Sequence, residues 1–193
     1  MKIAMILMLI TFVSLNFEEK GCLEQTWNLL PDSYTHKKFD IEHDLTKNGR
    51  YLSCDSFLTP FEVSSFLKQI KESIAKSDKT ATADVFDYPI EVNFRSDSML
   101  VEDYELNINT QEELINNFKE IFTDRFRALL SCTNIDNVFS MPSQGVLLGH
   151  GELIFSLDFD SADRIIKITK VSVNNNSIDK WLSKNSCESI PIQ

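Results

Sequence analysis

His150 and Glu152 are the first candidates for chemistry, because they lie two residues apart in residues 145–155, GVLLGHGELIF. An imidazole beside a carboxylate can act as an acid–base pair. In a strand, residues two apart share one face, so the same spacing also produces a hydrogen-bonded pair on the protein surface. The sequence leaves both interpretations open.

No other pattern predicts a metal, phosphate or cofactor site. The histidines are scattered and no two cysteines form a Cys-x-x-Cys pair, so the spacing does not predict zinc. Asp158, Asp160 and Asp163 lack the glycine and the distal glutamate of a calcium loop. Gly149 and Gly151 lie within alternating residues, whereas a phosphate-binding loop separates a strand from a helix. We therefore predict a long bent strand here, and no cofactor, metal or catalytic residue.

The first sixteen residues, MKIAMILMLITFVSLN, have the composition of a secretory signal. Lys2 supplies the positive charge, residues 3–13 form the apolar stretch, and no acidic residue occurs. This stretch is short for a membrane span, which needs about 20 apolar residues. We expect residues 1–21 to be removed and the mature protein to be extracytoplasmic, either periplasmic or secreted. Lipid attachment at Cys22, which follows Gly21, and an uncleaved anchor are the alternatives.

An even number of cysteines in an exported chain favours disulfide bonds. The four cysteines, which allow three pairings, are Cys22, Cys54, Cys132 and Cys187. If residues 146–157 and 164–173 form neighbouring antiparallel strands, the tail returns toward the segment before Gly145. This topology predicts that Cys132 pairs with Cys187 and leaves Cys22 for Cys54.

The chain carries a formal net charge of −10. An acidic surface repels the phosphate backbone, so we expect no nucleic-acid partner. Basic partners are attracted more readily. Acidity that serves only solubility is the alternative interpretation.

Helices are predicted at two capping boxes, Thr59–Glu62 and Thr110–Glu113, which begin helices ending near residues 75 and 130. A short helix is expected over residues 79–86. Residues 22–58 show weak periodicity, and we interpret them as an irregular N-terminal arm.

Strands follow from a hydrophobic period of two. Residues 88–95 and 100–108 alternate, which predicts a hairpin with one face in water. Its inward face carries three polar groups that could line a pocket, namely Tyr88, Tyr104 and Glu102. In the last strand the apolar residues change from even to odd positions after Ile168. One extra residue is needed to bury both sets, so we predict a bulge at Thr169–Lys170.

This order of elements resembles the nuclear transport factor 2-like superfamily. The resemblance rests on Tyr88-Pro89 entering the first strand, Glu112-Glu113-Leu114 opening the long helix, and residues 145–155. It implies an α+β fold in which a curved antiparallel sheet wraps two to three N-terminal and central helices into a cone. It divides the chain into signal peptide, N-terminal arm, domain and C-terminal tail, at residues 1–21, 22–58, 59–174 and 175–193.

In this superfamily the cone encloses a pocket that some members use for catalysis and many use only for binding. We expect an exported, non-catalytic binding protein, immunity-like or with a role in the cell envelope. Its partner would be another protein or a second copy of the chain, held on an outward surface of Val146, Leu148, His150, Glu152 and Ile154. The alternative is a small-molecule binder or isomerase-like enzyme in which Glu102 acts as the base inside the cone. A closed, aromatic-filled interior would favour the first, and an open interior with converging polar groups the second.

Overall fold

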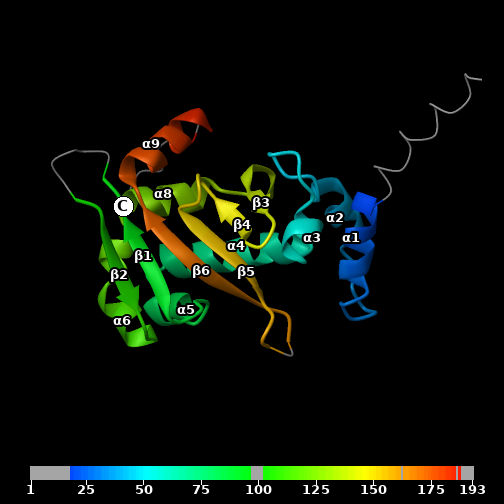
Figure 1. Ribbon diagram of the computed structural model, residues 1–193, viewed down its shortest axis with the longest axis horizontal. Coiled ribbons are helices and arrows are strands. Elements are labelled where there is room, and N and C mark those ends of the chain that lie inside the picture. Colours follow the sequence, from blue (N-terminus) through cyan, green and yellow to red (C-terminus); the bar gives the residue numbers. More distant parts are fainter. Residues whose placement is uncertain (1–17, 97–101, 162, 186, 188–193) are drawn as a thin grey trace, which may run out of the picture.

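The computed structural model describes residues 18–96, 102–161, 163–185 and 187. The fold is α+β, with helices packed against a six-stranded sheet (Figure 1). The helices are α1 (Glu18–Trp27), α2 (Lys37–His43), α3 (Leu52–Ser56), α4 (Pro60–Ala75), α5 (Lys79–Ala83), α6 (Gln111–Asn116), α7 (Phe118–Ile121), α8 (Asp124–Cys132), the 3-10 helix η1 (Ile135–Asn137) and α9 (Asn175–Lys184). The strands are β1 (Ile90–Phe94), β2 (Tyr104–Ile108), β3 (Phe139–Met141), β4 (Gly145–Leu148), β5 (Leu153–Asp158) and β6 (Ile165–Val173).

The N-terminal arm is helical, which corrects the prediction of an irregular segment. Helices α1, α2 and α3 are short, and polar contacts hold them together. The buried carboxylate of Asp40 accepts hydrogen bonds from Trp27 Nε1, the Tyr34 hydroxyl and the backbone N–H of Phe61, at 2.8, 2.6 and 3.0 Å. These helices are stabilised by polar contacts and not by a wide apolar face, so their sequences lack the helical hydrophobic period. The signal boundary predicted after residue 21 falls inside α1.

Helix α4 begins as predicted, because Thr59 and Glu62 form a capping box through reciprocal side-chain and backbone bonds. The second predicted helix is instead divided into α6, α7 and α8. Asn117 ends α6, and Thr123 starts α8 by accepting a hydrogen bond from the N–H of Phe126. A threonine cap inside the apolar repeat offers the backbone an alternative partner and restarts the helix.

The sheet has the strand order β2-β1-β6-β5-β4-β3 and is antiparallel except for the parallel pair of β1 and β6. It is therefore mixed and not purely antiparallel, and it is not strongly curled around the helices. The predicted hairpin is present as β1 and β2, with Phe94 opposite Tyr104. Its turn lies outside the described residues.

Residues 145–158 form a hairpin, which corrects the prediction of one bent strand. Strands β4 and β5 pair through Leu148 and Leu153, and the turn between them contains Gly149 and Gly151. Their φ angles are +68° and +99°, which glycine adopts without a steric penalty. The turn shifts the phase of alternation, so Val146 and Leu148 of β4 point into the core.

The predicted bulge in the last strand is confirmed. Ile154 pairs with Lys170 and Phe155 pairs with Ile168, which leaves Thr169 as the extra residue. Ile168, Val171 and Val173 are consequently all buried.

The two disulfide bonds have the predicted pairing, with Cα–Cα distances of 5.0 Å for Cys22–Cys54 and 6.0 Å for Cys132–Cys187. Disulfides are typical of an oxidising, extracytoplasmic setting. None of the helices in the described ranges is long and apolar enough to cross a membrane.

Replacing both Cys132 and Cys187 with serine is expected to lower the free energy of unfolding by about 2–4 kcal/mol. The bond closes a loop with a sequence separation of 55, so its loss frees the unfolded chain. Urea unfolding followed by circular dichroism measures the change. A double variant as stable as the wild type would contradict a structural role for this bond.

Candidate functional site

The interior between helices and sheet is filled with aromatic rings. Phe66 lies 4.9 Å from Phe155, and Phe122 lies 4.8 Å from Phe118 and 5.7 Å from Phe126, measured between ring centroids. All five rings are buried. These rings pack against one another in the described part of the interior, so we look for ligand sites at the edges of the fold.

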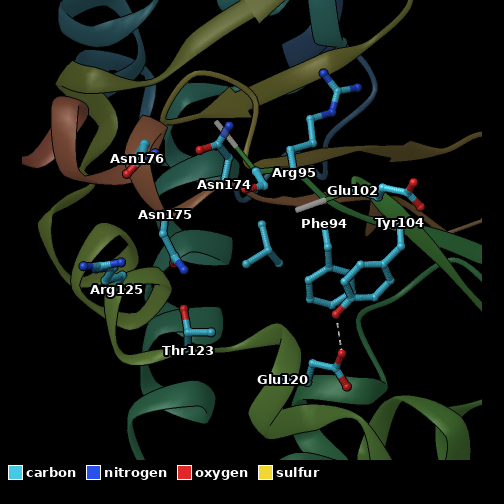
Figure 2. A pocket seen from close by; sticks show the side chains of 12 residues that line it. Phe94, Arg95, Glu102, Tyr104, Glu120, Thr123, Arg125, Asn174, Asn175 and Asn176 are labelled. Atoms are coloured by element: carbon cyan, nitrogen blue, oxygen red, sulfur yellow. Dashed lines mark hydrogen bonds between the residues drawn. The ribbon is translucent and has the colours of Figure 1, made fainter. Parts of the chain in front are cut away.

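A pocket of about 540 Å³ does occur at one end of the sheet, where β1 and β2 meet α8 and α9. Figure 2 shows the stacked rings of Phe94 and Tyr104 on one side, with Thr123, Arg125 and Asn175 on the other. The two rings lie 4.5 Å apart and nearly parallel. The volume falls in the range of sites that bind small molecules.

Two of the three predicted pocket residues line this cavity. Tyr104 is half exposed, and its hydroxyl donates a hydrogen bond to Glu120 (Figure 2). Desolvation, followed by the hydrogen bond and charge of Glu120, raises the pKa of Tyr104 to about 12. The phenol therefore remains protonated at neutral pH and donates its proton in a hydrogen bond to Glu120. Glu102 is exposed at the cavity wall, outside any strand, and does not point into a closed cone.

Tyr88 lies apart from this cavity, before the start of β1, whereas Phe94 and the pocket are at its end. Its hydroxyl donates to the carbonyl of Ala83 at 3.0 Å. Desolvation, followed by the charge of Asp84, raises the pKa of Tyr88 to about 12. Its contacts are those of a residue that anchors α5 to the sheet.

His150 and Glu152 do not form a side-chain acid–base pair. The buried carboxylate of Glu152 accepts hydrogen bonds from the backbone N–H of His150 and from the hydroxyl of Ser177. His150 Nδ1 lies 3.2 Å from the same hydroxyl. In a serine triad the carboxylate orients the imidazole, whereas here it binds the serine directly. These hydrogen bonds connect the turn that contains Gly149 and Gly151 to the start of α9.

The predicted interaction surface is not exposed as a whole. Val146 and Leu148 are completely buried, and Glu152 is 3% exposed, so they cannot contact a partner. Ile154 points to the outer sheet face as expected but is only 8% exposed. His150 alone of the five is well exposed. The phase shift at the glycine turn accounts for the inward direction of Val146 and Leu148.

An exposed apolar surface that the sequence analysis missed lies at the outer end of the β5–β6 hairpin. It consists of Phe57, Phe159 and Ile165, which are 51%, 70% and 38% exposed, and we call it the aromatic patch. The ring of Phe57 meets that of Phe159 edge-to-face at 5.8 Å. A phenylalanine between two aspartates in a turn, as in Asp158-Phe159-Asp160, was the available signal, since a turn gives an aromatic ring nothing to bury against.

Arg164 holds the aromatic patch in place. Its guanidinium donates to both carboxylate oxygens of Glu62, at 2.8 and 2.9 Å, and to the carbonyl of Phe57 at 2.7 Å. Paired in this way, Arg164 fixes the start of β6 to the corner between α3 and α4. In the described ranges, no basic side chain forms an ion pair with Asp158, Asp160 or Asp163, which surround Phe159. The patch is thus an apolar centre with an acidic rim.

Comparison of this chain with protein-family models, curated proteins and solved structures found no match. Among the described residues, no group of three histidine, cysteine or acidic side chains is placed to hold a metal ion. The two features of the described residues that could bind a partner or ligand are the aromatic patch and the pocket beside Tyr104.

Proposed function

We propose that this protein is an exported, non-catalytic member of the nuclear transport factor 2-like superfamily that binds another protein through the aromatic patch. The observation that carries the proposal is the pair of exposed rings, Phe57 and Phe159, which meet edge-to-face. Exposed aromatic residues in a fixed position are typical centres of protein interfaces, where polar residues form the rim. The closed interior supports surface binding over catalysis inside a cone.

The acidic rim favours a partner with a basic surface. Asp158, Asp160 and Asp163 surround the patch, and the whole chain carries a net charge of −10. Opposite charges speed the encounter of two proteins and exclude acidic competitors. A partner that meets this patch would therefore present an apolar centre among lysine or arginine side chains.

The proposal is tested by affinity capture from the organism that carries the gene, with purified protein as bait. Phe159→Asp is expected to reduce capture of the partner at least about tenfold, because it places a charge at the apolar centre. Ile41→Asp is the matched control, since Ile41 on α2 is equally exposed at 67% but lies outside the patch. Capture that survives Phe159→Asp, or that both variants abolish equally, would overturn the proposal.

Export is tested by the mass of the mature protein. We expect a chain that starts between Leu15 and Cys22, which keeps the Cys22–Cys54 disulfide, and that is recovered outside the cytoplasm. Intact-mass spectrometry of fractionated cells measures the start. The full chain with Met1, recovered from the cytosol, would contradict this expectation.

Small-molecule binding is the second candidate function, and the pocket beside Tyr104 favours it. A ligand there would shield the half-exposed ring of Tyr104. Screening a compound library by thermal shift tests this candidate, with Tyr104→Ala as the variant that should lose the response.

A further inference from the structure

One edge of β6 is left without a neighbouring strand at Ile165–Lys167. On one side β6 pairs with β5 along this stretch. On the other side, within the described residues, β1 reaches only Val171–Val173, and Phe86 makes a single bridge to Ile168. A free strand edge presents backbone donors and acceptors to any chain that can lie beside it.

The backbone of Ile166 points toward this free edge. The N–H of Ile168 donates to the carbonyl of Val85 at 2.8 Å, and its carbonyl accepts from the N–H of Asp87 at 3.0 Å, so Ile168 points away from β5. Backbone direction alternates along an antiparallel strand, so Ile166 points the same way. No described residue bonds to the N–H or carbonyl of Ile166. The edge thus carries one donor and one acceptor in strand geometry.

A groove of about 530 Å³ runs along this edge. Its far wall is formed by α4 and the N-terminal arm, whose apolar side chains there are Leu30, Tyr34, Phe61 and Phe66, beside the polar Glu62, Ser65 and Gln69. Alternate side chains of an added strand would face this apolar wall, and the others would face solvent.

The charge around the groove favours a basic occupant. Both cations that line it are already engaged, Arg164 with Glu62 and Lys167 with the carbonyl of Asp84. The aspartates of the hairpin, which continue from the same strand, have no cationic partner among the described residues. The lining itself is balanced, because Glu62 and Asp84 oppose these two cations, so the attraction for a basic occupant comes from the three hairpin aspartates and the net charge of −10.

We infer that the free edge of β6 accepts an extended, basic segment of a partner protein as an added strand. This inference rests on the proposed function and specifies how the partner is held. Ile165 belongs both to the aromatic patch and to the groove, so the added strand would lie beside the patch. The free edge is three residues long, about 10 Å, so the strand supplies register and specificity to an interface that the patch anchors.

The test uses a fluorescein-labelled peptide, Lys-Val-Lys-Val-Lys, and fluorescence anisotropy with the full mature protein. The basic peptide is expected to bind. A peptide with N-methyl groups on both valines should bind at least about tenfold more weakly, because it cannot complete the backbone bonds. The acidic analogue Glu-Val-Glu-Val-Glu should bind at least about tenfold more weakly as well, because the hairpin aspartates beside the groove repel it.

Ile166→Pro provides the matching change in the protein. It removes an N–H that faces the groove and not β5, and edge strands accept proline at such positions. Its far-ultraviolet circular dichroism should therefore match that of the wild type, while the basic peptide binds at least about tenfold more weakly. Undiminished binding of the N-methylated peptide to the wild-type protein, or failure of the basic peptide to bind it, would overturn the inference. If Phe159→Asp still abolishes capture of the partner in that case, the proposed function stands without the added strand.

Discussion

Replacing Phe155 with alanine is expected to lower the free energy of unfolding by about 3–5 kcal/mol. The ring is completely buried on β5 and packs 4.9 Å from Phe66 of α4, so it joins the sheet to the helices. The alanine variant buries less apolar surface on folding, and it contains a cavity that the close-packed neighbours cannot fill. Urea unfolding followed by circular dichroism measures the loss.

Phe159→Ala, four residues along the same hairpin, is the matched control. This ring is 70% exposed and makes one aromatic contact, with Phe57, so we expect a loss below about 1 kcal/mol. Equal losses for the two variants would contradict the assignment of Phe155 to the core and of Phe159 to the surface. The comparison also shows whether Phe159 can be replaced without lowering the free energy of unfolding, as expected of a residue that serves a partner.

Asp40→Ala is expected to destabilise the N-terminal arm by about 2 kcal/mol or more. The buried carboxylate accepts three hydrogen bonds, from Trp27, Tyr34 and Phe61, and these join α1 and α2 to the start of α4. Alanine would leave the N–H groups of Trp27 and Phe61 without this acceptor, at about 1–3 kcal/mol each, whereas the Tyr34 hydroxyl keeps Thr59 Oγ1 at 3.2 Å. The loss is local, so urea unfolding should be combined with limited tryptic digestion at Lys37 and Lys38.

Asp40→Asn separates the hydrogen bonds from the size of the side chain. Asparagine has the same shape and keeps one oxygen acceptor, so it should lose clearly less stability than alanine. Faster tryptic cleavage in the alanine variant than in the asparagine variant is the expected order. An alanine variant within about 0.5 kcal/mol of the wild type, with unchanged cleavage, would show that this network does not hold the arm.

The sequence alone determined the features that depend on near neighbours in the chain. The capping box of Thr59 and Glu62 is such a case, because both partners lie within one helical turn. The bulge at Thr169 is another, since the parity of apolar residues within one strand requires it. The disulfide pairing followed from the order of the last two strands, which brings the C-terminal tail back to Cys132.

The hairpin of β4 and β5 needed the tertiary structure. Residues 146–148 and 153–155 are all apolar, so no polar residue fixes the phase of alternation on either side of the glycines. A straight strand and a hairpin therefore fit the same pattern. In the structure a side chain at Gly149 would collide with the carboxylate of Glu152, which is a contact that only the folded turn creates.

The candidate sites were decided almost wholly by tertiary structure. Phe57 follows α3, whereas Phe159 and Ile165 belong to the β5–β6 hairpin, and no periodicity connects these two segments. The bonds of Arg164 to Glu62 and Phe57 bring these segments together across a sequence separation of more than a hundred residues. The free edge of β6 depends equally on where β1 and Phe86 stop pairing. Sequence patterns report which face of an element is apolar, whereas exposure depends on which other elements cover that face.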